Sequence, residues 1–196
     1  MTSSTSLLPF ALLISATAAC ATTGAAAGPS SAGSVAARPA ITEAEVAAAQ
    51  DGWCAALLDI SKLSAAGGDT VGQAERVLSS AYAYDTGTVL FKPTLTSGAQ
   101  TFRFDKEGAL AYFVGGNPAY PDDKGFARKP WTSCTPEIRN WLTDGDIAIA
   151  MGNVHFVDST GAKVKVDKTF GYQRAADGAL QIVLHHSSLP YSPAAK

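Results

Sequence analysis

The spacing of the apolar residues changes once along the chain, and this change limits the fold more than any other feature. A capping box, Thr42 with Glu45, opens a segment that ends at Gly67-Gly68. Within it the apolar residues recur at helical spacing: Val46, Ala49, Trp53, Leu57 and Ile60. Asp69 is the expected cap of a second helix, which a turn at 85–87 ends. Two helices are therefore predicted before residue 88.

Beyond residue 88 the pattern is typical of strands and turns. Strands are predicted over 89–92, 101–105, 109–114, 147–157, 163–174 and 180–187, and a short helix over 136–142. Turn residues at 158–161 and 175–178 favour an antiparallel meander of the last three strands. Helices first and strands after predict an α+β fold, with the helices covering one face of a curved sheet.

The first forty residues differ in composition from the rest, with no acidic residue and a single basic one, Arg38. An apolar run over 7–14 is too short for a membrane core that needs about 20 residues, but it suits a secretory signal. We therefore expect an exported, periplasmic protein. Its predicted parts are a signal over 1–20, a flexible Ala/Gly/Ser/Pro tether over 21–40 and one domain over 41–196.

The three cysteines leave two questions open. Cys20 follows Thr17-Ala18-Ala19, which resembles a weak lipoprotein processing site. A membrane anchor through a lipid on Cys20 and ordinary cleavage near Ala18 or Ala19 are both compatible with this segment. Cys54 and Cys134 remain in the domain, where they either pair after export or stay as two buried thiols.

Charge and histidine content argue against several kinds of site. The net charge of −2 and the absence of a basic run argue against nucleic acid as a partner. The histidines are His155, His185 and His186, whereas a zinc site needs three or four converging ligands. Neighbouring residues of a strand face opposite sides, so His185 and His186 cannot enter one pocket. No metal cofactor is expected, and manganese or zinc is the less favoured alternative.

Strict alternation in the last predicted strand sorts its residues onto two faces. One face would carry Gln181, Val183, His185 and Ser187, and the other Leu180, Ile182, Leu184, His186 and Ser188. The polar His185-x-Ser187 pair suits a concave pocket, although two half-solvated faces would give the same pattern. His155 is expected to be structural, and Arg103 to be solvated or salt-bridged.

Several motifs resemble those of the iota-class carbonic anhydrases. They are Lys92-Pro93-Thr94, 109–116, Gly125-Phe126-Ala127, Met151-Gly152-Asn153, Lys168-Thr169-Phe170 and 185–190, the last being His-His-Ser-Ser-Leu-Pro. They cover nearly all of 41–192 in the family's order. The resemblance implies the nuclear transport factor 2-like cone of the calcium/calmodulin-dependent kinase II association domain. This is a curved antiparallel sheet with helices across it, usually in a homodimer.

The resemblance also implies a reaction, the reversible hydration of CO2 to bicarbonate and a proton without an obligatory metal. In metal-free members a Thr, a Tyr and a Ser line an apolar pocket and hold CO2, water or bicarbonate. The matching residues are Thr94, Tyr112 and Ser187. His185 is the expected base or proton relay, because free His titrates near about 6.5 and free Tyr near about 10.

Two departures from the family pattern reduce the number of available metal ligands. Leu184 stands where many members have a third His, and Ala111 where Ser is frequent. Two other functions fit the same fold. One is a noncatalytic oligomerisation or small-ligand-binding module. The other is an isomerase or dehydratase, which usually needs a buried Asp or His base, and the predicted strands offer Asp105 and Asp167.

Overall fold

The structure is a computed structural model that describes residues 39–193. Its helices are α1 (Glu43–Ala65), α2 (Thr70–Ala81) and α3 (Lys106–Val114). Its strands are β1 (Leu90–Lys92), β2 (Trp131–Asp144), β3 (Ile147–Asp158), β4 (Lys163–Arg174) and β5 (Leu180–Ser188). The predicted signal, most of the predicted tether and Cys20 lie outside the described residues.

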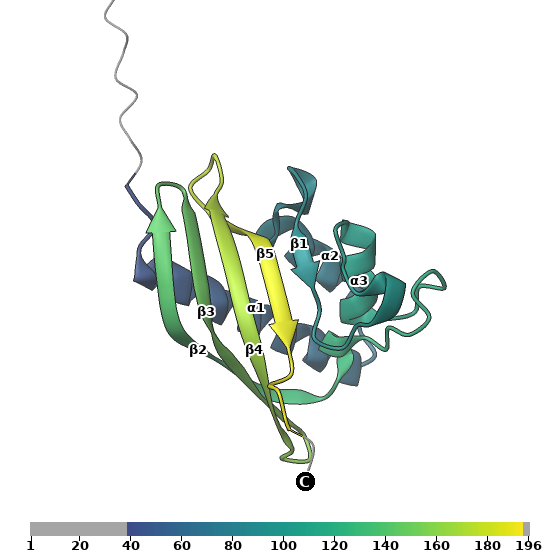
Figure 1. Cartoon of the computed structure of the whole chain (residues 1–196). Helices are drawn as coiled ribbons and strands as arrows, with labels where there is room; N and C mark the ends of the chain where they lie inside the picture. The colour runs from purple at the N-terminus through teal and green to yellow at the C-terminus, as the bar shows by residue number, and fades with distance from the viewer. Residues whose placement is uncertain (1–38, 194–196) are drawn as a thin grey trace, which may run out of the picture. The chain divides into compact units, whose positions relative to one another are not determined.

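The strands form one sheet in the order β1-β5-β4-β3-β2. Strands β2 to β5 make an antiparallel meander, and β1 pairs in parallel with β5. Helix α1 crosses one face of the curved sheet, while α2 and α3 lie beside β1 (Figure 1). The predicted α+β architecture, with helices on one face of a curved, mostly antiparallel sheet, is therefore confirmed.

Helix α1 begins at the predicted capping box. Thr42 Oγ1 accepts from the Glu45 N–H at 3.3 Å, and Glu45 Oε2 accepts from the Thr42 N–H at 2.8 Å. Its apolar stripe is buried, and each large side chain so placed stabilises the fold by about 1.5–3 kcal/mol. A disulfide between Cys54 and Cys134 ties α1 to β2, which answers the question that the sequence left open.

The predicted strands at 101–105 and 109–114 are wrong. Asp105 caps a helix instead, accepting from the Gly108 N–H at 2.7 Å, and α3 runs to Val114. Residues 111–114 are all buried. A continuous apolar run in such a position has no polar face, so periodicity cannot tell a short helix from a strand.

The predicted helix at 136–142 is also wrong, because this segment lies within β2. Pro136 pairs with Val154 across the ladder. Strand β2 is at the edge of the sheet, and an edge strand tolerates the N–H that proline lacks.

A bulge in β5 corrects the expected faces of the last strand. Tyr172 pairs with Ile182 while Gly171 pairs with Leu184, which leaves Val183 as an extra residue. Ile182 therefore shares the inner face with His185, and Val183, although unpaired, is half-buried and also packs against the core. The opposite orientation of His185, which is 1% exposed, and the exposed His186 is confirmed.

Candidate active site

Two of the predicted site residues meet where β1 and β5 run side by side. Thr94 follows β1, Ser187 lies near the end of β5, and both side chains are buried. The oxygens Thr94 Oγ1 and Ser187 Oγ are 2.5 Å apart, and either hydroxyl can be the donor. Lys92 Nζ donates to the carbonyl oxygen of Ser187 at 2.9 Å, which holds the two strand ends together.

The third predicted residue, Tyr112, comes to this point from α3. Its ring stacks on Phe126 with centroids 5.6 Å apart and meets Phe91 edge-on at 5.8 Å. Its buried hydroxyl oxygen makes no hydrogen bond of ordinary geometry to a described residue, although Thr94 is close enough to lower its pKa. Burial outweighs that effect and raises the pKa of Tyr112 to about 12. Tyr112 is therefore a neutral phenol at neutral pH, able to donate a hydrogen bond.

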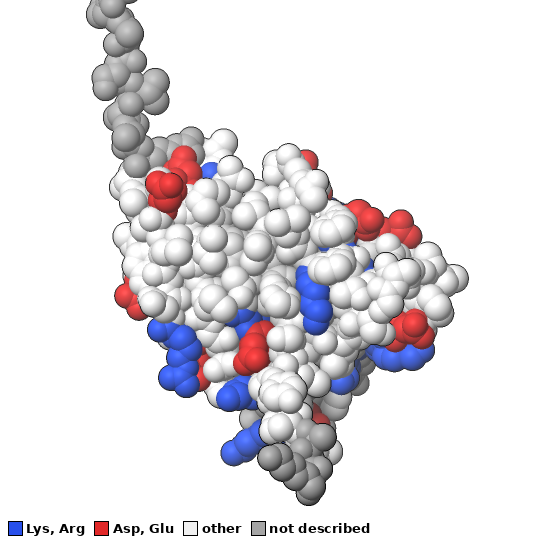
Figure 2. All heavy atoms as spheres, viewed as in Figure 1, with Lys and Arg blue, Asp and Glu red and all other residues white. Residues whose placement is uncertain are grey.

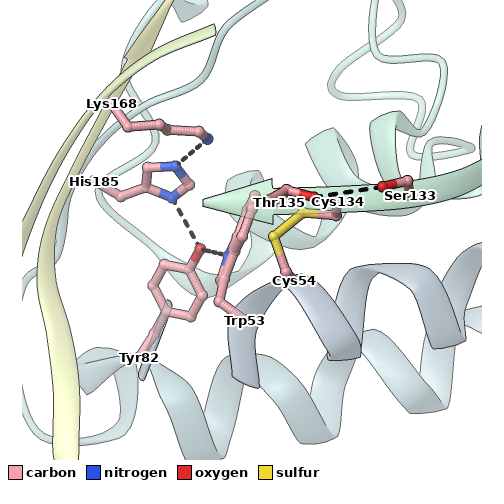
Figure 3. The surroundings of a disulfide bond; sticks show 8 residues. All are labelled: Trp53, Cys54, Tyr82, Ser133, Cys134, Thr135, Lys168 and His185. Atoms are coloured by element: carbon pink, nitrogen blue, oxygen red, sulfur yellow. Dashed lines mark hydrogen bonds between the residues drawn. A yellow bond between two sulfur atoms is a disulfide. The ribbon is translucent and has the colours of Figure 1, made fainter. Parts of the chain in front are cut away.

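His185 lies on the same inner face as Ser187 but is bound into a separate network (Figure 3). Its Nδ1 is 2.9 Å from the Tyr82 hydroxyl and its Nε2 is 2.7 Å from Lys168 Nζ. Burial and the nearby Lys168 hold the pKa of His185 well below its usual range. With both ring nitrogens engaged, His185 makes no hydrogen bond to Thr94 or Ser187.

The rest of this network was not predicted from the sequence. Trp53 Nε1 donates to the Tyr82 hydroxyl at 2.9 Å, so Trp53 is more than an apolar anchor. Lys168 is buried, with its Nζ 4.5 Å from the centre of the Trp53 ring. The missed signal was alternation in β4, which puts Lys168 on the face of the buried Val166 and Phe170.

Arg103 forms a buried ion pair near the site, with Nη2 3.0 Å from Asp123 Oδ2. The prediction of a salt-bridged Arg103 is confirmed, but the residue is not solvated. The guanidinium also stacks on Tyr120, 4.7 Å from the ring centre. His155 pairs instead with Glu137, at 2.8 Å on the outer face of β3 and β2, which is consistent with a structural role.

Within residues 39–193, no group of three or more His, Cys, Asp or Glu side chains is arranged to hold a metal ion. The chemistry that the described side chains offer is that of hydroxyl groups, an amine and an imidazole, set among aromatic rings. Such groups can orient water and stabilise a developing oxyanion through hydrogen bonds.

Comparison with known proteins also indicates an enzyme that works without a metal. Residues 44–189 match the family model of the metal-independent carbonic anhydrases. A metal-independent carbonic anhydrase from Nostoc sp. (strain PCC 7120) is 48% identical over 157 residues, which are 78% of this chain and 75% of that protein.

One solved structure supports the fold, and a second shows only a partial likeness. A cyanobacterial iota-carbonic anhydrase, complexed with bicarbonate, has a TM-score of 0.77 at 46% identity, covering 79% of this chain and 95% of that one. A calcium/calmodulin-dependent kinase II-type association domain from Thiobacillus denitrificans has a TM-score of 0.46 at 16% identity, covering 74% and 94%. From the family match and the extent of the identity, the chain belongs to the metal-independent, iota-class carbonic anhydrases.

Proposed function

We propose that this carbonic anhydrase hydrates CO2 to bicarbonate and a proton at the three hydroxyls of Thr94, Tyr112 and Ser187. Family membership supplies the reaction and its independence of metal. The observation that carries the location is the buried hydrogen bond between Thr94 and Ser187, with Tyr112 close enough to Thr94 for its pKa to be affected. That the cyanobacterial relative was solved with bicarbonate supports a site for the same anion here.

The hydroxyls have the donors that the reaction needs. A hydroxyl donates one hydrogen bond and accepts two. In the Thr94–Ser187 pair one group donates to the other, so the second keeps its own O–H for the substrate. Tyr112 adds an O–H that makes no hydrogen bond of ordinary geometry to a described residue. The proposed site therefore has two donors, and the rings of Phe91 and Phe126, which contact Tyr112, give it apolar neighbours that suit a nonpolar gas.

In the proposed reaction these groups orient a water molecule and stabilise the product. The water oxygen attacks the carbon of CO2, and negative charge develops on the CO2 oxygens as the new bond forms. Tyr112 and the free hydroxyl of the Thr94–Ser187 pair donate to those oxygens, as an oxyanion hole does. Since the pKa of Tyr112 is raised to about 12, its phenolate is not the base.

The direct test is stopped-flow CO2 hydration by the purified chain after chelator treatment, with residual metal measured by mass spectrometry. Hydration without metal is expected. Activity that appears only with added manganese or zinc would contradict the metal-free mechanism. No activity in either condition would favour a noncatalytic binding or oligomerisation module of this fold.

A homodimer through the outer face of the sheet is proposed as the assembly. Large apolar side chains are exposed on this side of the molecule, among them Leu142, Ile149, Met151, Phe102 and Phe104. In this view the upper part of the face is largely uncharged, whereas Lys, Arg, Asp and Glu side chains lie near its centre, across its lower part and at its margins (Figure 2). An apolar surface of this kind usually marks a protein interface. Light scattering should give a dimer, and Met151→Lys should shift it to the monomer.

Export to the periplasm is proposed from the composition of residues 1–40. No helix among the described residues is long and apolar enough to cross a membrane. A lipid on Cys20 would anchor the protein, and cleavage near Ala18 or Ala19 would release it. Cell fractionation, followed by mass spectrometry of the amino terminus, separates these two outcomes, and a cytoplasmic full-length chain would contradict both.

A further inference from the structure

Lys168 is buried in the inner layer of the sheet without an acidic partner. It is 6% exposed, and its flanking inner-face residues, Val166 and Phe170, are buried too. No ion pair of the described residues includes it; its hydrogen-bond partner is His185 Nε2, at 2.7 Å. Burial of an unpaired ammonium is costly, and the usual response is loss of the proton. Accordingly, burial holds the pKa of Lys168 well below its usual range.

The position of Lys168 relative to the proposed site follows from the strand register. Lys168 and Ser187 are directly opposite each other in the β4–β5 ladder, and both side chains are buried on the inner face. The Cβ atoms of such a pair are about 5 Å apart. The Lys168 side chain therefore starts directly beside Ser187, and its Nζ extends to the next inner-face residue of β5, His185, at Nε2. His185 in turn has both ring nitrogens engaged, by Lys168 and Tyr82.

The site needs a proton acceptor that its hydroxyls do not supply, because a neutral phenol and two aliphatic hydroxyls are poor bases at neutral pH. Building on the proposed hydration site, we propose that Lys168 is held as an uncharged amine and accepts the proton that CO2 hydration releases.

The proposed step is balanced without any further reactant. The water oxygen bonds to the carbon of CO2, one C=O pair moves onto oxygen, and the proton leaves the water for the lone pair of Lys168. Bicarbonate departs, and the ammonium then returns its proton to the solvent buffer. The net products are bicarbonate and a proton.

The network around Lys168 suits this cycle because it need not rearrange. In the proposed arrangement His185 keeps its proton on Nδ1 and donates it to Tyr82, whose oxygen also accepts from Trp53. His185 Nε2 is then an acceptor, and Lys168 donates an N–H to it both as amine and as ammonium. The lone pair of the amine stays available for the incoming proton.

Few other titratable groups face Lys168 and His185. Tyr82 contacts the second nitrogen of His185, and burial raises the pKa of Tyr82 so that it stays neutral. His186, on the outer face, lowers the pKa of His185 through its charge. Helix α1 contributes Trp53, which does not titrate, and β3 has Gly152 opposite Lys168. The buried carboxylate of Asp123 is neutralised by its ion pair with Arg103, and Asp167, next to Lys168 in β4, faces the opposite side of the sheet.

The charge state of Lys168 is measured directly by NMR of the full chain with isotope-labelled lysine and histidine. The expected result is one lysine amine that is uncharged at pH 7 and missing from the spectrum of Lys168→Met. His185 is expected to carry its proton on Nδ1. A charged Lys168 at pH 7, or a His185 protonated on Nε2, would overturn the proposal. If Lys168→Met fails to fold, the pH titration of the wild-type lysine signals alone shows whether one lysine is uncharged at pH 7.

The kinetic test compares Lys168→Met and Lys168→Arg with Lys163→Met, a change at an exposed lysine of the same strand. Loss of a general base should lower kcat about 100-fold in both Lys168 variants, with a smaller change in KM. Lys163→Met should match the wild type. Wild-type kcat should fall as the pH drops through the pKa of the amine, and this dependence should disappear in Lys168→Met.

The outcomes separate the two proposals. Unchanged kcat in Lys168→Met, with an active wild type, overturns the role of Lys168 and leaves the hydration site standing. Full activity in Lys168→Arg does the same, because a guanidinium cannot accept a proton. An inactive wild type overturns the hydration function itself, and with it the need for an acceptor.

Discussion

Thr94 and Ser187 lie 93 residues apart in the chain, and their hydroxyl oxygens are 2.5 Å apart in the interior. The contact exists because β1, a strand of three residues, joins the sheet in parallel beside β5. An isolated hydroxyl in the core would be costly, so each residue satisfies the other when no substrate is present. The pair is therefore both a structural contact and a proposed hydrogen-bonding part of the active site.

Replacing one member of this pair should affect stability and turnover together. Ser187→Ala leaves the Thr94 hydroxyl without its partner, at a cost of about 1–3 kcal/mol in the free energy of unfolding. Loss of one donor to the developing anion should lower kcat by about 100-fold. Urea unfolding and stopped-flow hydration measure the two effects.

A double-mutant cycle with Thr94→Val sharpens this test. Because the two hydroxyls act on each other, the double variant should be little worse than the more damaging single variant. Ser188→Ala, a change at the next residue on the other face of β5, is the matched control. Fully additive losses, or an equal loss in the control, would contradict a shared role.

Tyr112→Phe should separate function from stability. The hydroxyl of Tyr112 is buried without a hydrogen bond of ordinary geometry, so its removal should leave the melting temperature unchanged or slightly raised. Turnover should nevertheless fall strongly, because a donor to bicarbonate is lost. Tyr172→Phe is the control, since that hydroxyl is also buried without such a bond but lies on β4. Unchanged turnover in Tyr112→Phe would remove Tyr112 from the proposed site.

Local sequence signals predicted the elements that they control. The capping residues Thr42 and Asp69 begin α1 and α2 as expected, and the three-stranded meander follows its turns. The errors arose where the surroundings in the folded protein, and not the local sequence, determine the secondary structure. The run at 109–114 forms a helix because it is buried nearly all round, and Pro136 stands in a strand because that strand is at an edge.

The site could be predicted only in part for the same reason. The motifs led to Thr94, Tyr112 and Ser187, which the structure places close together, although no residue spacing brings them to one point. Their catalytic roles stay predictions. Lys168 was missed because a lysine in a strand is usually solvated, and its burial depends on α1 covering the sheet.

The ion pair of Glu45 with Arg174 predicts a loss of stability in acid. The distance from Arg174 Nη1 to Glu45 Oε1 is 2.7 Å, and the hydrogen bond lowers the pKa of Glu45 to about 2. An unfolded Glu titrates near about 4.3. A carboxyl with a lowered pKa stabilises the fold above the unfolded value, and this contribution is lost as the pH falls from about 4 to about 2.

The test is the melting temperature of wild type and Glu45→Gln against pH. Gln can still serve in the capping box, so the substitution chiefly removes the charge. The variant should be less stable at pH 7, and the two curves should converge as the pH approaches 2. A difference that stays constant over this range would rule out the ionised pair as its source.

The Arg103–Asp123 pair predicts a larger cost than any surface pair. Both side chains are almost completely buried, at 3% and 5% exposure. Asp123→Asn keeps the shape but leaves a buried guanidinium without its counter-charge, which should destabilise the fold by about 3–5 kcal/mol. Arg103→Met combined with Asp123→Leu should recover much of that loss in denaturant unfolding. A single variant as stable as the wild type would contradict the buried ion pair.

The disulfide between Cys54 and Cys134 should stabilise the domain chiefly through the unfolded chain. It joins residues separated by 80 positions. A loop of this length corresponds to about 4 kcal/mol in the chain-entropy model. Cys54→Ala combined with Cys134→Ala should therefore lower the melting temperature by about 10 °C.

The same bond also bears on the active site. Cys54 follows Trp53, whose ring nitrogen donates to Tyr82 and so supports the hydrogen bond to His185 (Figure 3). Because buried apolar side chains also hold α1 against the sheet, kcat at 25 °C should be nearly unchanged while heat inactivation becomes faster. A reducing agent should reproduce this pattern in the wild type and have no effect on the double variant. An unchanged melting temperature in the double variant would show that the bond does not stabilise the folded protein. Sensitivity of that variant to the reducing agent would show that the reductant acts elsewhere.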